Sequence, residues 1–85
     1  DEKIHTLKIY EDSEIANRTI EELSFESFTG VRIIAIRRKN RWIYGPTGKT
    51  KLKPNDILIV RGVEEGYREI RPVAHAEGNW EEVIE

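Results

Sequence analysis

Basic side chains gather around one asparagine in the stretch GVRIIAIRRKNRWIYGP, residues 30–46. Four cations flank Asn40, namely Arg37, Arg38, Lys39 and Arg41. Guanidinium groups donate two parallel hydrogen bonds to a carboxylate or a phosphate, so this cluster predicts recognition of a small anion. A solvated turn, or a sheet edge that charge protects from pairing with other chains, explains the same residues without a ligand.

The apolar and aromatic residues of this stretch allow two interpretations. Ile33, Ile34 and Ile36 could line a pocket for a base, but isoleucines in strands usually belong to the core. We expect Ile33 in the core, and Ile34 and Ile36 on the other face of the strand, where a second subunit could cover them. Trp42 and Tyr44 share one face and could stack on a nucleobase. Packing of a helix against the sheet explains these two rings equally well.

Three other patterns do not predict catalysis or metal binding. Residues 45–50, GPTGKT, end like a phosphate loop, but the first Gly of that motif is missing and no capped helix follows. The acidic loop at residues 11–14 lacks the ligand spacing of a calcium loop, and a solvated linker explains it better. His5 and His75 have no third ligand or nucleophile nearby, and the chain has no Cys. We therefore expect neither an enzyme nor a metal site.

The charge of the chain is divided into blocks. The 85 residues are 35% charged and 38% hydrophobic, which indicates one small globular domain. Residues 30–62 hold nine Lys or Arg against one acid, a balance of +8, whereas residues 1–29 and 63–85 carry −5 each. This partition favours an anionic ligand, or charge pairing within or between subunits. No apolar run approaches the roughly 20 residues that a membrane span requires.

Hydrophobic periodicity predicts an α+β domain with a small mixed β-sheet of about four strands and two short helices, in the order β-α-β-β-β-α. The expected strands span residues 4–10, 31–38, 41–44 and 57–61, and the expected helices span residues 19–26 and 63–71. The first strand alternates in polarity and should lie at or near a sheet edge. Thr19 and Glu22 form the capping box of a helix start. Pro72 should end the second helix at about Arg71.

Two turns and one boundary complete the expected layout. Lys39-Asn40 is predicted to form a two-residue hairpin turn, because Asn tolerates positive φ. Pro54-Asn55-Asp56 predicts a type I turn, with Asp56 as a turn residue. Residues 1–72 should form the folded domain, and residues 73–85 an acidic tail or docking segment. The chain begins at Asp1 and has no Met, which we interpret as a fragment or a processed product.

Three segments, in this order, resemble the TrkA-C domain family, the C-terminal lobe of regulators of potassium conductance. NRTIEEL resembles that family's helix G-x-T-L-x-E-L, GVRIIAIRR precedes a basic turn, and LKPNDILIVRG resembles the closing strand L-x-P-G-D-x-L-x-V-x-G. The resemblance covers about residues 7–71. Asn17 and Asn55 stand where the family commonly has Gly, and Asn also adopts left-handed backbone conformations.

The resemblance implies a regulatory domain that pairs with a second copy and binds a small ligand near the two-fold axis of the pair. Some family members bind cyclic di-adenosine monophosphate there, through apolar strand residues and through basic or amide groups around the first hairpin. The positions of this chain that match are Ile33, Ile34, Arg37, Arg38, Asn40, Ile43 and Pro46. The implied ligand is a cyclic dinucleotide or another small anion, and no other cofactor is expected.

The interpretation that follows is a regulatory ligand-binding and dimerisation domain of a potassium channel, a potassium transporter or a related transport protein. The expected partners are a second copy and an upstream domain or a membrane transport protein, with a cytoplasmic location. One alternative is a small basic, β-rich nucleic-acid-binding module, which the acidic blocks disfavour. Another is an assembly domain without a ligand, in which the basic hairpin meets acids of a partner subunit.

Overall fold

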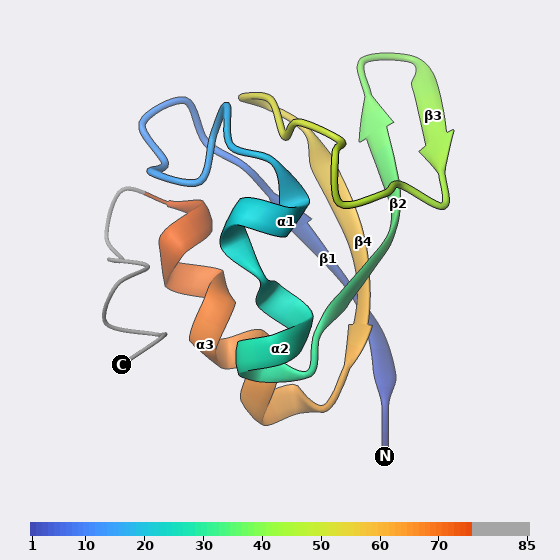
Figure 1. Ribbon diagram of the computed structural model, residues 1–85, viewed down its shortest axis with the longest axis vertical. Helices are drawn as coiled ribbons and strands as arrows, with labels where there is room; N and C mark the ends of the chain where they lie inside the picture. Colours follow the sequence, from blue (N-terminus) through green and yellow to red (C-terminus); the bar gives the residue numbers. More distant parts are fainter. Residues whose placement is uncertain (76–85) are drawn as a thin grey trace.

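The computed structural model describes residues 1–75, so residues 76–85, most of the predicted acidic tail, lie outside the described part. The elements are β1 (Lys3–Lys8), α1 (Ile20–Leu23), α2 (Phe25–Thr29), β2 (Arg32–Arg38), β3 (Arg41–Tyr44), β4 (Ile57–Gly62) and α3 (Glu64–Ala74). The four strands form one sheet in the order β1-β4-β2-β3, with β1 at one edge as expected. Figure 1 shows the helices together on one side of this sheet. The α+β class is confirmed, although the sheet is antiparallel throughout rather than mixed.

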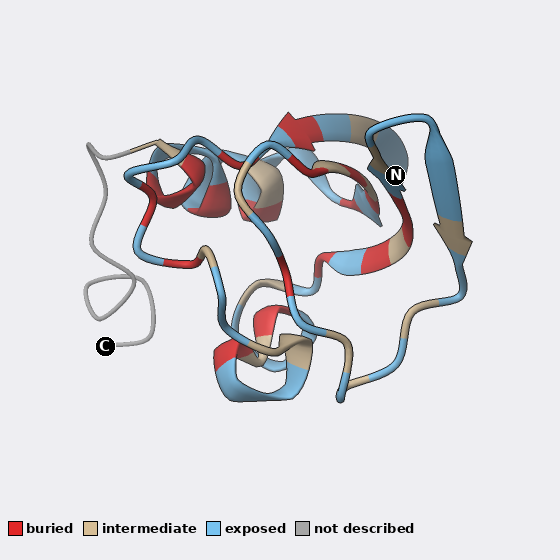
Figure 2. Ribbon diagram, turned by 90° about the horizontal axis from the view of Figure 1, so that it is seen from above, coloured by how far each residue is buried: buried red, intermediate tan, exposed pale blue. Residues whose placement is uncertain are grey.

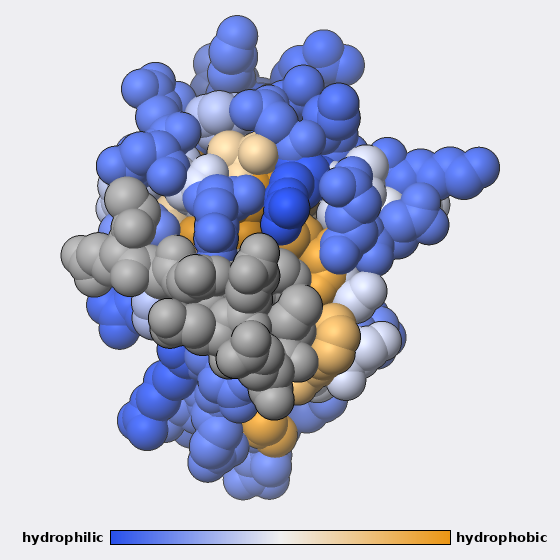
Figure 3. Space-filling model, turned by 60° about the vertical axis from the view of Figure 1, so that its left-hand side comes forward, coloured by the Kyte–Doolittle hydropathy of each residue, from blue (hydrophilic) through white to orange (hydrophobic). Residues whose placement is uncertain are grey.

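The core lies between the sheet and the helices because one face of each strand is apolar. Leu7, Leu58 and Val60 turn toward the helices and are buried, and they pack with Leu23 and Ile70 from the helix layer. Figure 2 shows buried residues in the helices and along the other strands, while β3 stands at the rim and is largely exposed. Figure 3, which brings another side of the molecule forward, shows apolar surface in a narrow band among hydrophilic side chains. Within residues 1–75, the three helices all lie on one face of the sheet and none covers the other face.

A β-bulge in β2 changes which side chains face the core. The pairing between β2 and β4 shifts between Ile33 and Ala35, so that Ile34 is the extra residue. Ile36 is 0% exposed and belongs to the core, whereas Ile34 is half-buried. The prediction that Ile36 lies on the outer face with Ile34 is therefore wrong, because strict alternation does not continue through a bulge.

Both predicted turns form, each with a backbone conformation that differs from the expected one. In the hairpin, Lys39 rather than Asn40 has a positive φ, of 57°. In the second turn, Asp56 N–H donates to the Lys53 carbonyl and Asn55 has a φ of 71°. A positive φ at the third position is the mark of a type II turn, so the type I prediction is wrong. Asn55 thus occupies the left-handed position for which the family commonly uses Gly.

The first predicted helix is divided in two. The capping box forms as expected, since the Thr19 hydroxyl accepts from Glu22 N–H and the Glu22 carboxylate accepts from Thr19 N–H. Ser24 has a φ of 52° and ends α1, and α2 then begins at Phe25. This left-handed residue turns the chain so that Leu23 and Phe25 are both buried although they are only two positions apart.

The last helix continues past Pro72, contrary to the prediction. Val73 and Ala74, which the sequence assigned to the tail, are almost fully buried in α3. Pro72 lies in the final turn, where its missing N–H removes one helical hydrogen bond. The Ser13 hydroxyl and Tyr10 N–H donate to the carbonyls of Val73 and Ala74, so the helix end is capped from elsewhere in the chain. None of the helices within residues 1–75 has the length and apolarity that a bilayer crossing requires.

The capping box predicts a pH dependence of stability. The hydrogen bond from Thr19 N–H to its carboxylate lowers the pKa of Glu22 below 4.5 in the folded protein. A lowered pKa stabilises the fold above the unfolded pKa, and this contribution disappears as the pH falls through the folded pKa. In thermal unfolding followed by circular dichroism, Glu22→Gln should therefore have a lower Tm than the native chain above pH 4.5. The two Tm values should converge in more acidic solution; a gap that persists there would contradict the role of the charge.

Candidate functional site

A cleft of about 580 Å³ lies between α1–α2 and the beginning of β2. Its wall also includes the segment that follows β3. The lining residues are Ile20, Glu21, Ser24, Phe25, Glu26, Ser27, Val31, Arg32, Ile33, Ile34, Gly45, Pro46 and Gly48. A cleft of this size accommodates a ligand of drug-like dimensions, which bind in pockets of roughly 300–1,000 Å³.

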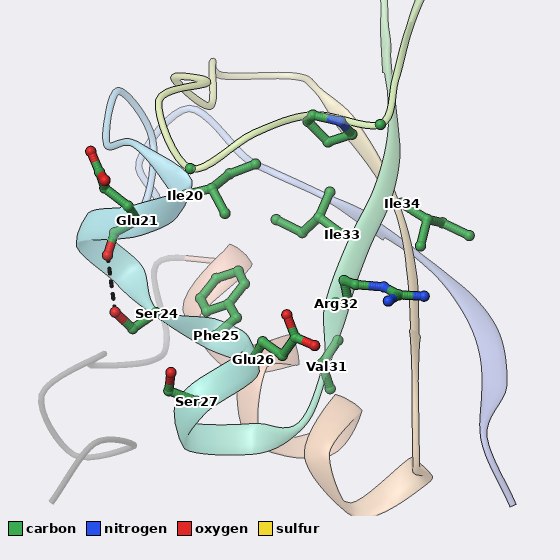
Figure 4. A pocket seen from close by; sticks show the side chains of 13 residues that line it. Ile20, Glu21, Ser24, Phe25, Glu26, Ser27, Val31, Arg32, Ile33 and Ile34 are labelled. Carbon is green, nitrogen blue, oxygen red and sulfur yellow. Dashed lines mark hydrogen bonds between the residues drawn. The ribbon is translucent and has the colours of Figure 1, made fainter.

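The cleft has an apolar interior and a polar rim. In Figure 4, Ile33 points toward Ile20 and Phe25, whereas Ile34 and Arg32 point to the opposite side of β2. The rim carries two carboxylates, Glu21 and Glu26, and the hydroxyls of Ser24 and Ser27. The Ser24 hydroxyl donates to the Glu21 carbonyl at 2.9 Å. An apolar group can enter the cleft, while charged groups of the same ligand remain at its mouth.

The bulge and a left-handed glycine position the mouth of the cleft. Gly45 follows β3 with a φ of 56°, and its N–H donates to the carbonyl of Ile34 at 3.2 Å. This contact carries the chain from β3 back past the bulge, so that Pro46 lies at the cleft beside Ile34. Ile34 belongs to β2 and Pro46 to the loop after β3, but both residues line the same cavity.

Three of the seven predicted site residues line the cleft and four do not. Ile33, Ile34 and Pro46 are the three. Arg37 and Asn40 lie toward the hairpin tip with exposed side chains. Ile43 is half-buried and packs against the core. The structure therefore separates the predicted apolar contacts from the predicted basic ones.

Arg38 is engaged by the protein itself. Its Nε and Nη2 donate to the two carboxylate oxygens of Asp56 at 2.9 and 2.8 Å, and Nη2 also donates to the Lys51 carbonyl. Asp56 is 1% exposed and also accepts from Lys53 N–H at 2.8 Å. The hydrogen bonds that Arg38 donates to the Asp56 carboxylate raise the pKa of Arg38, which keeps the guanidinium charged. This arrangement joins the turn end of the β2–β3 hairpin to the turn before β4.

The sequence interpretation missed the wall that α1 and α2 contribute. Phe25, Glu26 and Gly48 come from segments to which no ligand role was assigned. The glycine at position 48 indicates that the loop after β3 passes close to α1, because a Cβ atom at that position would lie 3.0 Å from the Cβ of Glu21. A small residue is needed where the loop passes α1. Among residues 1–75, the structure brings together no group of three His, Asp or Glu that could hold a metal ion.

The described residues define a small α+β domain with a four-stranded antiparallel sheet, helices on one of its faces and a cleft beside β2. Comparison with known families then identifies it: residues 4–75 match the TrkA-C domain, and the chain belongs to that family. Among curated relatives, it is 29% identical over 68 residues to a probable potassium channel protein of Methanocaldococcus jannaschii. It is 31% identical over 67 residues to an uncharacterized transporter of Synechocystis.

The match covers 80% and 79% of this chain but only 20% and 11% of these two relatives. Among solved structures, the chain is similar to the C-terminal RCK domain of the potassium transport protein KtrA in complex with cyclic diadenosine monophosphate, with a TM-score of 0.76 and 30% identity. The match covers 84% of this chain and 81% of that one. It is also similar to the RCK_C domain dimer of Streptococcus agalactiae BusR with the same ligand, with a TM-score of 0.77, 25% identity, and coverage of 86% and 90%.

Proposed function

We propose that this chain is the regulatory ligand-binding and dimerisation domain of a potassium channel, a potassium transporter or a related transport protein. The observation that carries the proposal is the cleft beside the bulge of β2, in a chain that belongs to the TrkA-C family. Relatives with this fold bind cyclic diadenosine monophosphate, and one of them does so as a dimer. The domain acts by binding and has no catalytic role of its own.

The ligand is a small anion with an apolar or aromatic part, of which a cyclic dinucleotide is the leading example. Ile33 and Pro46 receive the apolar part, and the outward-pointing Ile34 contacts a second copy or the ligand held between two copies. Arg32 lines the cleft with an exposed side chain and is able to approach the phosphates. Arg38 acts indirectly, by fixing the hairpin through Asp56.

The mechanism is a linkage between ligand binding and subunit arrangement. A ligand that contacts both copies stabilises the arrangement in which the two clefts face each other. It biases an attached gate by no more than the difference between its affinities for the two arrangements. This function places the domain on the cytoplasmic side of a transport protein, either in the same chain or bound to it.

Calorimetric titration with cyclic diadenosine monophosphate tests the proposal. The native chain should bind one ligand per two copies. Ile34→Asp should lose at least about tenfold in affinity, which corresponds to about 1.4 kcal/mol of binding free energy. A charged side chain at this position would be desolvated at the mouth of the cleft.

Ile4→Asp is the matched control, because Ile4 is 63% exposed on the edge strand β1 and outside the cleft. It should bind like the native chain. Equal affinity of Ile34→Asp and the native chain would refute the site, and absence of binding by the native chain would refute the ligand class. The ligand should be recovered unchanged after incubation, and hydrolysis would refute the purely regulatory role.

A further inference from the structure

The face of the sheet opposite α1, α2 and α3, which no helix of the described residues covers, has an ordered composition. Strand pairing arranges its side chains in three rows: Lys8, Ile57, Arg37 and Trp42; Thr6, Ile59, Ala35 and Tyr44; and Ile4, Arg61 and Arg32. The four cations of these rows flank a band of apolar and aromatic groups. The acid that pairs with this face is Glu2, which binds Arg61 at 3.1 Å. We call these three rows the open face.

Two aromatic side chains form a ledge at the β3 end of the open face. The rings of Trp42 and Tyr44 stack with centroids 5.8 Å apart and planes 9° apart. They remain 46% and 75% exposed, and Arg37 lies directly opposite Trp42 on the neighbouring strand. Trp, Tyr and Arg are the residues that contribute most to binding energy at protein interfaces. This composition is typical of a surface that binds a polypeptide.

The distribution of charge limits which partner fits. The acids of the helices lie on the other side of the sheet, for example Glu21 and Glu22 on α1 and Glu64 and Glu65 on α3. Face-to-face pairing of two open faces would bring like charges together. A long nucleic acid would meet the acidic remainder of the molecule. A short acidic segment that also carries apolar side chains fits both the cations and the ledge.

The chain contains such a segment in residues 76–85, AEGNWEEVIE, which has four Glu, no Lys or Arg, and the apolar residues Trp80, Val83 and Ile84. The chain reaches it from His75, whose ring lies 4.2 Å from that of Tyr10. The Lys8 ammonium lies 5.2 Å from the centroid of the Tyr10 ring. The described part of the chain therefore ends at His75, beside Tyr10, whose ring the first residue of the first row, Lys8, also approaches.

The length of the segment is sufficient to cross the sheet. Ten residues in extended conformation reach about 33 Å. Four strands at about 4.8 Å spacing place the outer two about 14 Å apart. We propose that residues 76–85 dock across the open face of their own chain, with the glutamates toward Lys8 and Arg37 and the apolar side chains against the ledge. This inference does not depend on the ligand of the cleft.

Paramagnetic relaxation in NMR spectra of the 85-residue chain tests the docking. Because the chain has no Cys, Glu85→Cys provides a single attachment site for a nitroxide label. The relaxation enhancement should be largest at the amides of Arg37 and Trp42 and at the Trp42 indole N–H. It should be weak at Ile20 in the cleft, and should decrease when salt screens the charges.

Charge reversal supplies the matched comparison. Lys8→Glu with Arg37→Glu should abolish the enhancement on the open face. Lys49→Glu with Arg71→Glu makes the same change in net charge at exposed positions outside this face, and should preserve the enhancement.

An isotope-labelled chain without nitroxide, mixed with a nitroxide-labelled chain without isotope, should show no enhancement. Enhancement in that mixture would overturn docking within one chain in favour of a second copy. Absence of enhancement on the open face, with resonances of Trp42 and Tyr44 shifting on addition of a single-stranded oligonucleotide, would overturn it in favour of nucleic acid.

Discussion

An Asp56→Ala variant should lose about 2–4 kcal/mol of its free energy of unfolding. Asp56 is 1% exposed and accepts three hydrogen bonds, two from the Arg38 guanidinium and one from Lys53 N–H. Removal of the carboxylate leaves both donors without this acceptor. The Arg38 side chain is 31% exposed and can be partly hydrated, so the loss falls below that of a fully buried ion pair. Chemical denaturation followed by Trp fluorescence measures the change.

Glu2→Ala is the matched control for this variant. It also removes the carboxylate of a pair with an arginine, Arg61, but both side chains are about half exposed. Exposed pairs contribute about 0–1 kcal/mol, so the control should remain close to the native chain. A double-mutant cycle with Arg38→Ala should give a favourable coupling energy between Arg38 and Asp56. Similar small losses for Asp56→Ala and Glu2→Ala would mean that the Arg38–Asp56 pair does not stabilise the fold.

A Gly66→Ala variant should be destabilised by about 1–3 kcal/mol, although alanine is the better helix former. A Cβ atom at Gly66 would fall inside contact distance of the Thr29 carbonyl oxygen and 3.0 Å from a methyl group of Val31. Since the first of these is a backbone atom at the end of α2, it cannot move away as a flexible side chain would. The two helices must separate, which also loosens the packing around Val31.

Glu69→Ala provides the control in the same helix, because Glu69 is exposed on α3. Its stability should stay within about 0.5 kcal/mol of the native value, as is usual for surface substitutions. Thermal unfolding monitored by circular dichroism should show a clear fall in Tm for Gly66→Ala alone. A Tm for Gly66→Ala above that of the native chain would show that helix propensity outweighs the contact with Thr29.

The elements of the fold could be predicted from local patterns, and their irregularities could not. Alternation of polarity placed β1 at an edge, and the capping box placed the start of α1. The bulge at Ile34 left no mark in the sequence, because both neighbours of this residue are apolar. Helix α3 continues past Pro72 because distant groups, from Tyr10 to Ser13, cap its last carbonyls. Tertiary contacts of this kind override local preference.

The residues of the candidate site could also be predicted only in part. The family motifs predicted Ile33, Ile34 and Pro46 as ligand contacts; the structure places these three at the cleft, and their contact with a ligand stays a prediction. Arg38 was expected to face an anion, and no local pattern pairs it with Asp56, 18 residues away. The pairing depends on the burial of the Asp56 side chain at the end of a turn whose other residues are exposed or half-buried, and this burial cannot be predicted from composition.

The pairing of β1 with β4 has a consequence for how the domain forms. Lys3 pairs with Gly62 and Lys8 with Ile57, and the Tyr67 hydroxyl donates to the Thr6 carbonyl across 61 positions. Strand β1 can therefore complete its contacts only after β4 and α3 have been synthesised. Such high contact order predicts slow folding. During synthesis on the ribosome, β1 must wait with an unpaired edge until β4 and α3 have left the exit tunnel, so that the domain folds in one late step.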